Sequence, residues 1–279
     1  MKLNVVLQGD CLTVLDEYPK DFFDLIVTSP PYAEARKHTY GGIAPDKYIP
    51  WFLPRAQQFQ RVLKPEGTFI LNIKENVYRG ERLTYVLELV LALTRAQGWL
   101  WTEEFIWHKK NCIPGKWPNR FRDAWERLLQ FNKQRKFAMY QDEVMVPVGD
   151  WAEKRFATGV CESDRQLHHS KTQSGVRRRV ANWEDRKLVY PSNVLHLATE
   201  CSNRGGSAVF PMALPDWFIR LFTQPGDVVL DPFIGTGTTA VAATRLERHY
   251  VGIDILESEC ARARVRIAQE GHAMPNEEN

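Results

Sequence analysis

Apolar runs alternate with segments of helical spacing over the first 107 residues of the chain. Short, mainly apolar runs bounded by turn signals are typical of buried strands, whereas apolar residues three and four positions apart are typical of helices. Because strands that alternate with helices build parallel sheets, the pattern indicates an α/β fold. It predicts strands at residues 3–7, 23–28, 68–73 and 99–107, helices at 11–18, 48–63 and 82–97, and a turn at 64–67.

The middle of the chain has a different pattern. From about residue 133 to residue 192 the periodicity weakens and charged residues become frequent, as expected of an insertion or a small second lobe. The alternation then returns and continues almost to the C-terminus. It predicts helices at residues 215–222, 240–246 and 257–269 and strands at 227–230 and 249–253.

The composition favours a soluble enzyme with one substantial core. A chain of 279 residues with 44% hydrophobic content can bury such a core, and no stretch reaches the roughly 18 apolar residues that cross a bilayer. A net charge of +3 is too small to indicate a nucleic-acid binder by itself. Five scattered cysteines form no CxxC pair, so neither a zinc site nor a disulfide framework is expected. We therefore expect a cytoplasmic enzyme without a metal site.

The segment Thr28-Ser29-Pro30-Pro31-Tyr32 carries the first candidate chemistry, directly after the apolar run at 22–27. Two consecutive prolines cannot donate backbone hydrogen bonds, and they hold the chain extended. The Ser29 hydroxyl and the Pro30 carbonyl then lie together as acceptors, beside the ring of Tyr32. This arrangement suits a site that holds a planar base by its exocyclic amino group while an aromatic ring stacks on its face.

A glycine loop near the C-terminus carries the second candidate chemistry. Gly235 and Gly237 stand between a predicted strand and a predicted helix, where backbone can approach a ligand and free N–H groups can bind an anion. Asp254 ends the next predicted strand, where a carboxylate can hold ribose hydroxyls. The loop also matches the dinucleotide fingerprint, so an NAD-linked oxidoreductase stays open here. However, only residues 239–279 follow the loop, and the rest of the sheet must come from the N-terminal third, in a permuted order.

These motifs, in this order, resemble the permuted (beta-group) S-adenosylmethionine-dependent DNA amino-methyltransferases, and the resemblance covers nearly the whole chain. It implies a Rossmann-like methyltransferase fold, circularly permuted, with a mostly parallel central sheet and a smaller target-recognition lobe. Residues 1–132 would form the catalytic half, 133–192 the target-recognition insertion and 193–279 the cofactor-binding half. The stretches that carry the resemblance are 9–12, 29–32, 61–67, 107–111, 210–214, 231–239 and 252–254.

The resemblance also implies roles for single residues. Ser29, Pro30, Pro31 and Tyr32 would be catalytic: they would accept hydrogen bonds from the amino group of a flipped-out base and stack on its ring. The cofactor would be S-adenosyl-L-methionine. Its binding residues would be Asp10, Cys11, Phe210, Pro211, Asp231, Pro232, Phe233, Gly235, Gly237, Thr238, Thr239 and Asp254.

The resemblance implies double-stranded DNA as the partner, and the basic side chains of the middle region would neutralise its phosphates. A homodimer and a cognate restriction endonuclease are further possible partners that the resemblance implies. The candidate DNA-binding residues are Arg36, Lys109, Arg177, Arg178 and Arg179.

The identity of the methylated base rests on one residue. Methylation at carbon 5 of cytosine needs a cysteine nucleophile that follows a proline in that family, and no cysteine here follows proline. Adenine-specific relatives mostly carry Asp or Asn at the position of Ser29, whereas cytosine-N4 relatives mostly carry Ser. Ser29 therefore favours the N4 of cytosine. Adenine-N6 methylation stays open, and so does a DNA-binding protein that kept the fold without activity.

Overall fold

The computed structural model describes residues 1–34, 41–112, 115, 118–149, 187–200 and 209–271, together with the strand assignments at 168–169 and 177–178. Its contacts divide the chain into two units. The first comprises residues 1–140 and 193–279, and the second comprises residues 141–192. The second unit thus begins eight residues after the boundary expected at residue 133, because residues 138 and 140 bond to the backbone of Glu66 and Leu221 in the first unit.

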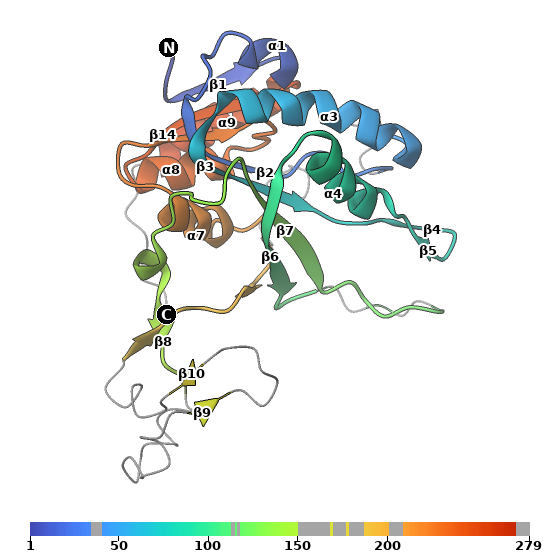
Figure 1. Cartoon of the computed structure of the whole chain (residues 1–279). Helices are drawn as coiled ribbons and strands as arrows, with labels where there is room; N and C mark the ends of the chain where they lie inside the picture. The colour runs from blue at the N-terminus through green and yellow to red at the C-terminus, as the bar shows by residue number, and fades with distance from the viewer. Residues whose placement is uncertain are drawn as a thin grey trace. The chain divides into compact units, whose positions relative to one another are not determined.

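An eight-stranded sheet forms the centre of the first unit (Figure 1). Neighbouring strands run parallel except where β7 pairs with β3 and with β6, so β7 alone runs against the others. The mostly parallel α/β sheet expected from the sequence is confirmed. In spatial order the strands are β1 (Val5–Gln8), β14 (His249–Asp254), β13 (Val228–Asp231), β2 (Phe23–Thr28), β3 (Leu63–Ile73), β7 (Trp125–Asn132), β6 (Leu100–Lys109) and β12 (Val194–Leu197).

The centre of this sheet joins the two ends of the chain. β13, from the C-terminal part, pairs directly with β2, from the N-terminal part, with Leu25 opposite Val229. β1 in turn pairs with β14 at the sheet edge. The permuted order predicted from the position of the glycine loop is therefore observed. Because β1, β14, β13 and β2 are parallel, their carboxyl ends and the loops that follow them share one edge of the sheet.

Helices cover the sheet in two groups. In the first group, α3 contacts both α1 and α4 (Figure 1). In the second group, α8 contacts both α7 and α9. Within α3, the apolar residues Phe52, Ala56 and Phe59 share one face and are fully buried, as their spacing of four and three predicts. The bounds are α1 Cys11–Leu15, α3 Pro45–Val62, α4 Tyr85–Ala96, α7 Ala213–Phe222, α8 Thr238–Arg245 and α9 Glu257–Glu270.

An aromatic cluster fills the core beside the central strands. The ring of Phe69 on β3 lies 5.5 Å from that of Phe59, 5.5 Å from that of Trp99 and 5.8 Å from that of Phe131, measured between centroids. All four side chains are at most 1% exposed. Burying such large rings stabilises the sheet by about 2 kcal/mol for each, and it gives the loops at the carboxyl edge a rigid base.

Four elements differ most from the prediction. The turn expected at 64–67 lies inside β3, where the register with β2 shifts: Phe23 faces Leu63, but Leu25 faces Thr68. The helix expected to start at residue 82 starts at Tyr85, because residues 81–82 form β5, which pairs with β4 (Val77–Tyr78). β7 and β12 were not predicted. The sequence of β7, WERLLQFN, places charged and apolar residues in an order that also fits a helix.

The described residues of the second unit form short elements. A 3₁₀ turn, η1 (Gln141–Val144), is followed by β8 (Val146–Pro147), which pairs antiparallel with β11 (Leu188–Val189). The Tyr190 hydroxyl donates to the Asp142 carboxylate at 3.1 Å. A further antiparallel pair joins β9 (His168–His169) and β10 (Arg177–Arg178). Across the part of the chain that the structure describes, we found no helix of the length and apolar character that crossing a membrane requires.

Candidate active site

A buried carboxylate joins the two motifs that the sequence singled out. The Thr28 hydroxyl, at the end of β2, donates to Asp231 Oδ1 at 2.6 Å, and the Thr239 hydroxyl donates to Oδ2 at 2.6 Å. The backbone N–H of Phe233 also donates to Oδ1, at 3.1 Å. Asp231 is 2% exposed, so it holds the strand before Ser29 against the glycine loop. The two motifs therefore lie side by side, although 203 residues separate Thr28 from Asp231.

The environment of Asp231 perturbs its ionisation. Burial raises the pKa of this carboxyl to about 6. The hydrogen bonds from Thr239, Thr28 and Phe233 favour the carboxylate and lower the pKa, but the effect of burial is larger. All three donors belong to the protein. Asp231, predicted as a cofactor ligand, thus connects elements of the fold and does not line the cleft described next.

A cleft opens at the carboxyl edge of the sheet, beside this connection. Its empty volume, open mouth included, is about 700 Å³. Most of its lining belongs to the loops that directly follow β1, β2, β13 and β14, where ligands of open α/β sheets bind. The lining residues are Gly9, Asp10, Cys11, Ser29, Pro31, Ile43, Trp51, Arg55, Pro232, Phe233, Gly235, Asp254 and Ile255.

The two glycines of the loop have different surroundings. Gly235 has a φ of +50°, and a Cβ built on it would meet nothing within 4 Å, so its backbone borders open space in the cleft. Gly237 has a φ of +86°, and a Cβ there would lie 3.0 Å from the Cβ of Ala263 on α9. Gly237 is therefore required for close packing of the loop on α9, whereas Gly235 leaves room for a ligand.

Asp254 fixes the far wall of the cleft. Its Oδ2 accepts from the backbone N–H of Gly235 at 3.1 Å, and its Oδ1 accepts from the N–H of Leu256 at 3.0 Å. The side chain lies at the end of β14 and is 4% exposed. Each carboxylate oxygen can accept more than one hydrogen bond, so Asp254 keeps acceptor capacity at the cleft.

A second carboxylate, Asp10, also lines the cleft, from the loop after the neighbouring strand β1. Its Oδ1 caps α1 by accepting from Leu12 N–H at 3.0 Å, and its Oδ2 pairs with Arg55 Nη2 at 2.7 Å. The guanidinium of Arg55 lies 4.4 Å over the ring of Trp51. Arg55 Nε is buried and, among the described residues, has no partner. The cleft thus contains a buried donor that an acceptor group of a bound ligand would satisfy.

The structure brings together only part of the predicted cofactor residues. Asp10, Cys11, Pro232, Phe233, Gly235 and Asp254 line the cleft. Ile43, Trp51 and Arg55 also line it and were missed; Trp51 and Arg55 stand four residues apart on one face of α3, a spacing that the sequence does show. The predicted residues that do not line the cleft are Phe210, Pro211, Asp231, Gly237, Thr238 and Thr239.

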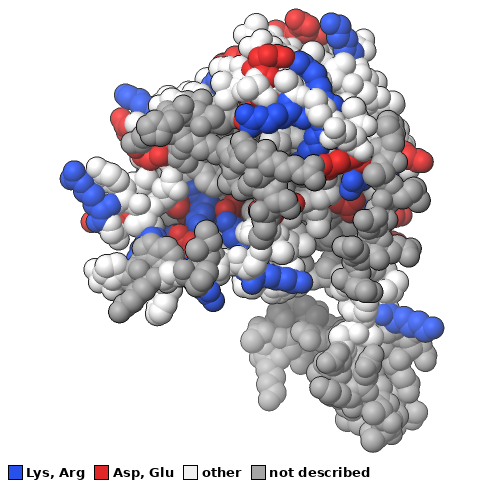
Figure 2. Space-filling model, turned by 180° about the vertical axis from the view of Figure 1, so that it is seen from behind, with Lys and Arg blue, Asp and Glu red and all other residues white. Residues whose placement is uncertain are grey.

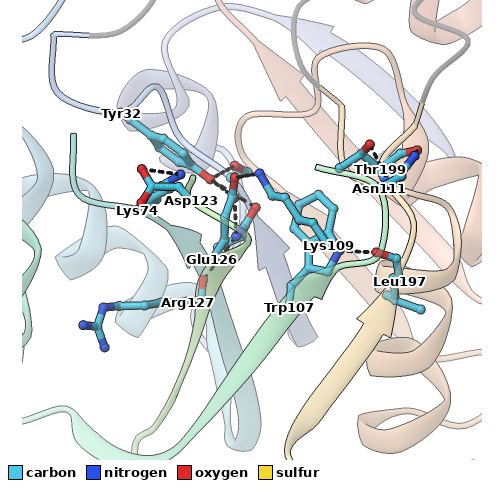
Figure 3. A network of polar contacts seen from close by, with 12 residues as sticks. Tyr32, Lys74, Trp107, Lys109, Asn111, Asp123, Glu126, Arg127, Leu197 and Thr199 are labelled. Carbon is cyan, nitrogen blue, oxygen red and sulfur yellow. Dashed lines mark hydrogen bonds and ion pairs between the residues drawn. The ribbon is translucent and has the colours of Figure 1, made fainter. Parts of the chain in front are cut away.

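The predicted catalytic segment borders the same cleft. Ser29 and Pro31 are among its lining residues, and the Pro31 carbonyl accepts a hydrogen bond from Tyr48 at 3.0 Å. The Tyr32 hydroxyl donates to Glu126 Oε2 on β7 at 2.7 Å. Figure 3 shows the phenol pointing toward the carboxylate of Glu126 and the ammonium of Lys109. The Tyr32 ring is therefore held at its hydroxyl end.

The thiols near the site are unsuited to nucleophilic attack. Cys11 lines the cleft, but burial raises the pKa of its thiol to about 12. Burial likewise raises the pKa of the Cys260 thiol to about 11. Both groups are thus protonated at neutral pH, and the thiolate is the reactive form. Among the described side chains, no group of three or more His, Cys, Asp or Glu residues is placed to hold a metal ion.

Of the predicted DNA-binding residues, the structure describes the side chain of Lys109 only. Its ammonium pairs with Glu126 Oε1 at 2.5 Å and is 17% exposed, so it faces the catalytic segment. Arg36 and Arg179 lie outside the described residues, and Arg177 and Arg178 are described only as part of β10. On the face in Figure 2, Lys and Arg side chains are interspersed with Asp and Glu, in keeping with the small net charge of +3.

A loop with an exposed aromatic residue was not predicted. Phe121 is 96% exposed, between Arg120 and Arg122 in the segment before β7. The Asp123 carboxylate forms an ion pair at 3.3 Å with Lys74, which precedes β4, and another at 2.7 Å with Arg82 in β5. An exposed aromatic ring between arginines is typical of surfaces that contact nucleic acid.

Comparison with known proteins identifies the family. A family model described as DNA methylase matches residues 23–265, a range that includes both motifs of the cleft. The chain belongs to the DNA methylase family. This membership confirms the resemblance to amino-methyltransferases, and it excludes the NAD-linked oxidoreductase.

Two curated methylases and two solved structures are similar to the chain. Type II methyltransferase M.PvuII of Proteus hauseri is 28% identical over 88% of this chain and 78% of its own length. Type II methyltransferase M.SmaI of Serratia marcescens is 27% identical over 94% of this chain and 90% of its own length. The solved PvuII DNA methyltransferase (cytosine-N4-specific) has a TM-score of 0.70 at 24% identity, covering 98% of this chain and 87% of that one.

The other solved structure is a DNA modification methylase from Thermus thermophilus, complexed with S-adenosyl-L-methionine. It has a TM-score of 0.62 at 23% identity, covering 97% of this chain and 95% of that one. The methylase family and this shared fold support S-adenosyl-L-methionine as the cofactor, as the sequence predicts.

Proposed function

We propose that this DNA methylase transfers a methyl group from S-adenosyl-L-methionine to the exocyclic N4 of cytosine in a base flipped out of duplex DNA. The hydrogen bond between Thr28 and Asp231 carries the proposal, because it holds Ser29 and the glycine loop at one cleft. A methyl donor and an acceptor amino group bound there would lie within reach of one another. Such positioning supplies much of the rate enhancement in a group transfer.

The cleft residues fit the cofactor. Asp254 offers carboxylate oxygens to ribose hydroxyls, Gly235 leaves room for backbone contact, and Trp51 and Phe233, with ring centroids 5.8 Å apart, offer an aromatic wall. Asp10 and the buried Arg55 Nε offer one acceptor and one donor. When bound, the sulfonium supplies an activated methyl group and a neutral leaving group.

The catalytic segment fits the amino group of the base. Nitrogen in an exocyclic amino group is a poor nucleophile, because its lone pair is delocalised into the ring. Acceptors at Ser29 Oγ and the Pro30 carbonyl hold its hydrogens and return electron density to nitrogen. The ring of Tyr32 stacks on the base, and its tethered hydroxyl keeps the ring plane fixed.

Ser29 supports cytosine as the target, because a hydroxyl stands where adenine-specific relatives mostly carry Asp or Asn. One similar structure is also named cytosine-N4-specific. The test is mass analysis of nucleosides from unmethylated plasmid DNA that has been incubated with the protein and S-adenosyl-L-methionine. N4-methylcytosine is expected. N6-methyladenine alone would refute the cytosine assignment and leave the methylase assignment intact.

The partners follow from this function. Residues 141–192 form a separate unit, which we propose as the target-recognition part, with Arg177, Arg178 and Arg179 as its DNA contacts. Arg36 follows the catalytic segment by four positions and would contact the DNA near the flipped base. A cognate endonuclease and a homodimer belong to the same proposal. Sequencing DNA from cells that express the protein reports the methylated base and its context together, and ultracentrifugation reports the oligomeric state.

A further inference from the structure

Glu126 on β7 is the centre of a polar network that meets the catalytic segment (Figure 3). Its Oε2 accepts from Tyr32 at 2.7 Å and from Asn72 Nδ2 at 3.1 Å, and its Oε1 pairs with Lys109 Nζ at 2.5 Å. Glu126 is 8% exposed. A buried carboxylate with this many donors is held in one orientation, and the hydroxyl of Tyr32 connects it to the cleft.

A chain of hydrogen bonds leads from the cleft to Glu126. The Ser29 hydroxyl donates to the Tyr32 oxygen at 3.4 Å, and Tyr32 donates to Glu126 Oε2 at 2.7 Å. Asn72 Oδ1, at 3.2 Å, is a second and more distant acceptor for the Tyr32 hydroxyl. Burial, together with the charge of Glu126, raises the pKa of Tyr32 well above its ordinary value, so the phenol carries its proton. Catalytic hydrogen bonds of this length often tighten when the substrate is bound.

The chemistry requires an exit for one proton. An amino nitrogen that attacks the methyl carbon becomes positively charged, and it regains neutrality only by losing a proton. We propose that Glu126 takes up this proton, relayed through Ser29 and Tyr32. This inference rests on the proposed amino-methyltransferase function, but it holds for either base, because the amino groups of cytosine and adenine both lose one proton.

The relay balances with the groups already present. The N–C bond forms as the C–S bond breaks, and the electron pair of the C–S bond stays on sulfur. The nitrogen then releases a proton to Ser29 Oγ, Ser29 passes its own proton to Tyr32, and Tyr32 passes its own to Glu126. The nitrogen keeps the electrons of the broken N–H bond. The products are a neutral methylamino group and a protonated Glu126, with Ser29 and Tyr32 restored.

Lys109 holds the carboxylate that ends this relay. Its ammonium pairs with Glu126 Oε1 at 2.5 Å. It lies 4.9 Å from the ring centroid of Trp107, and Trp107 Nε1 donates to the Leu197 carbonyl at 3.1 Å. The lysine is thus held in place from β6 and β12.

Glu75 offers a matched control. It is 7% exposed, close to the 8% of Glu126, and pairs with Arg127 at 3.0 Å. Glu75→Gln therefore removes a carboxylate of similar burial from the same region without touching Tyr32. Tyr32→Phe keeps the aromatic ring and removes the relay hydroxyl. Lys109→Met keeps Glu126 and removes its counter-charge.

The experiment measures single-turnover transfer of tritiated methyl groups to unmethylated plasmid DNA. Glu126→Gln and Tyr32→Phe should each lower the rate on the order of 100-fold, as loss of a general base does, with the affinity for S-adenosylhomocysteine unchanged. Lys109→Met should also lower the rate, because Glu126 loses the ammonium that pairs with it. Glu75→Gln should match the wild type.

Affinity for S-adenosylhomocysteine and the melting temperature are measured for every variant. A Glu126→Gln rate within threefold of wild type overturns the relay. If Glu126→Gln fails to fold, Tyr32→Phe decides: a rate within threefold of wild type overturns the relay. Failure of the wild type itself to methylate DNA refutes the proposed function, and the relay with it.

Discussion

The buried carboxylate of Asp231 predicts an unusual dependence of stability on pH. Its pKa is raised from 3.8 to about 6, mainly by burial. The folded state therefore binds this proton more tightly than the unfolded state, and the contribution to stability is present below pH 3.8 and lost as the pH rises through about 6. A difference of about 2 pH units corresponds to about 3 kcal/mol. Most of this contribution, about 2 kcal/mol, is lost between about pH 4 and about pH 7.

Asp231→Asn removes the ionisation and keeps a side chain of the same shape. The amide oxygen can still accept from Thr28, and the amide nitrogen can donate to the hydroxyl of Thr239 after that hydroxyl rotates. We expect the free energy of unfolding of the variant, relative to wild type, to rise by about 2 kcal/mol between about pH 4 and about pH 7. Urea unfolding followed by circular dichroism at both pH values measures this difference.

Asp123→Asn provides a control of opposite sign. Burial raises the pKa of Asp123, but hydrogen bonds from Arg82 and Lys74 outweigh it, and the net effect lowers the pKa. The stability that Asp123 contributes is therefore present above its unfolded-state pKa and lost in acid. Its replacement should cost more at about pH 7 than at about pH 4. A relative stability of Asp231→Asn that stays constant or falls over the same pH interval would refute the reasoning about Asp231.

The remaining predictions concern the cleft and the exposed loop. Gly237→Val should destabilise the fold by about 3 kcal/mol, since the new side chain meets Ala263 and the φ of +86° is strained; a wild-type melting temperature would contradict the packing role. Trp51→Ala should weaken S-adenosylhomocysteine binding about tenfold in calorimetry, because the Arg55 stack is lost; unchanged affinity would place the cofactor elsewhere. Phe121→Ala should leave the melting temperature unchanged and lower DNA affinity about tenfold in a gel-shift titration. Equal affinity would remove this loop from the DNA surface.

The sequence predicts much of this fold because the local signals agree with the tertiary structure. Periodicity placed β2, β13 and β14 within a residue or two, and the position of the glycine loop predicted the permuted order. β7 escaped prediction for a physical reason. Its Arg127 and Asn132 suggest a surface helix, yet Arg127 pairs with Glu75 and Asn132 donates to the Thr68 hydroxyl. These partners are 52 and 64 positions away, so the pairing exists only after distant segments have come together.

The same distinction between local sequence signals and contacts of distant segments applies to the site. Residues inside a short motif, such as Asp10, Gly235 and Asp254, were found because local spacing carries their signal. Glu126 was not, because it meets Tyr32 across 94 positions of the chain, and no local pattern records that contact. Gly237 belongs to a recognisable motif, but its backbone packs against Ala263 of α9 and does not line the cleft. The motif therefore predicts where the loop is, but it does not predict which residues of the loop face a ligand.

The placement of β13 between β2 and β14 has a consequence for synthesis of the protein. When the ribosome has made β1, β2 and β3, β1 has no neighbour, and one edge of β2 has no partner until β13 follows, about 150 residues after β3. At elongation rates of about 5–20 residues per second this lasts on the order of ten seconds or longer. During that time a hydrophobic strand edge is open to association with other chains. Nascent chains stopped before β13 should therefore be strong clients of ribosome-associated chaperones.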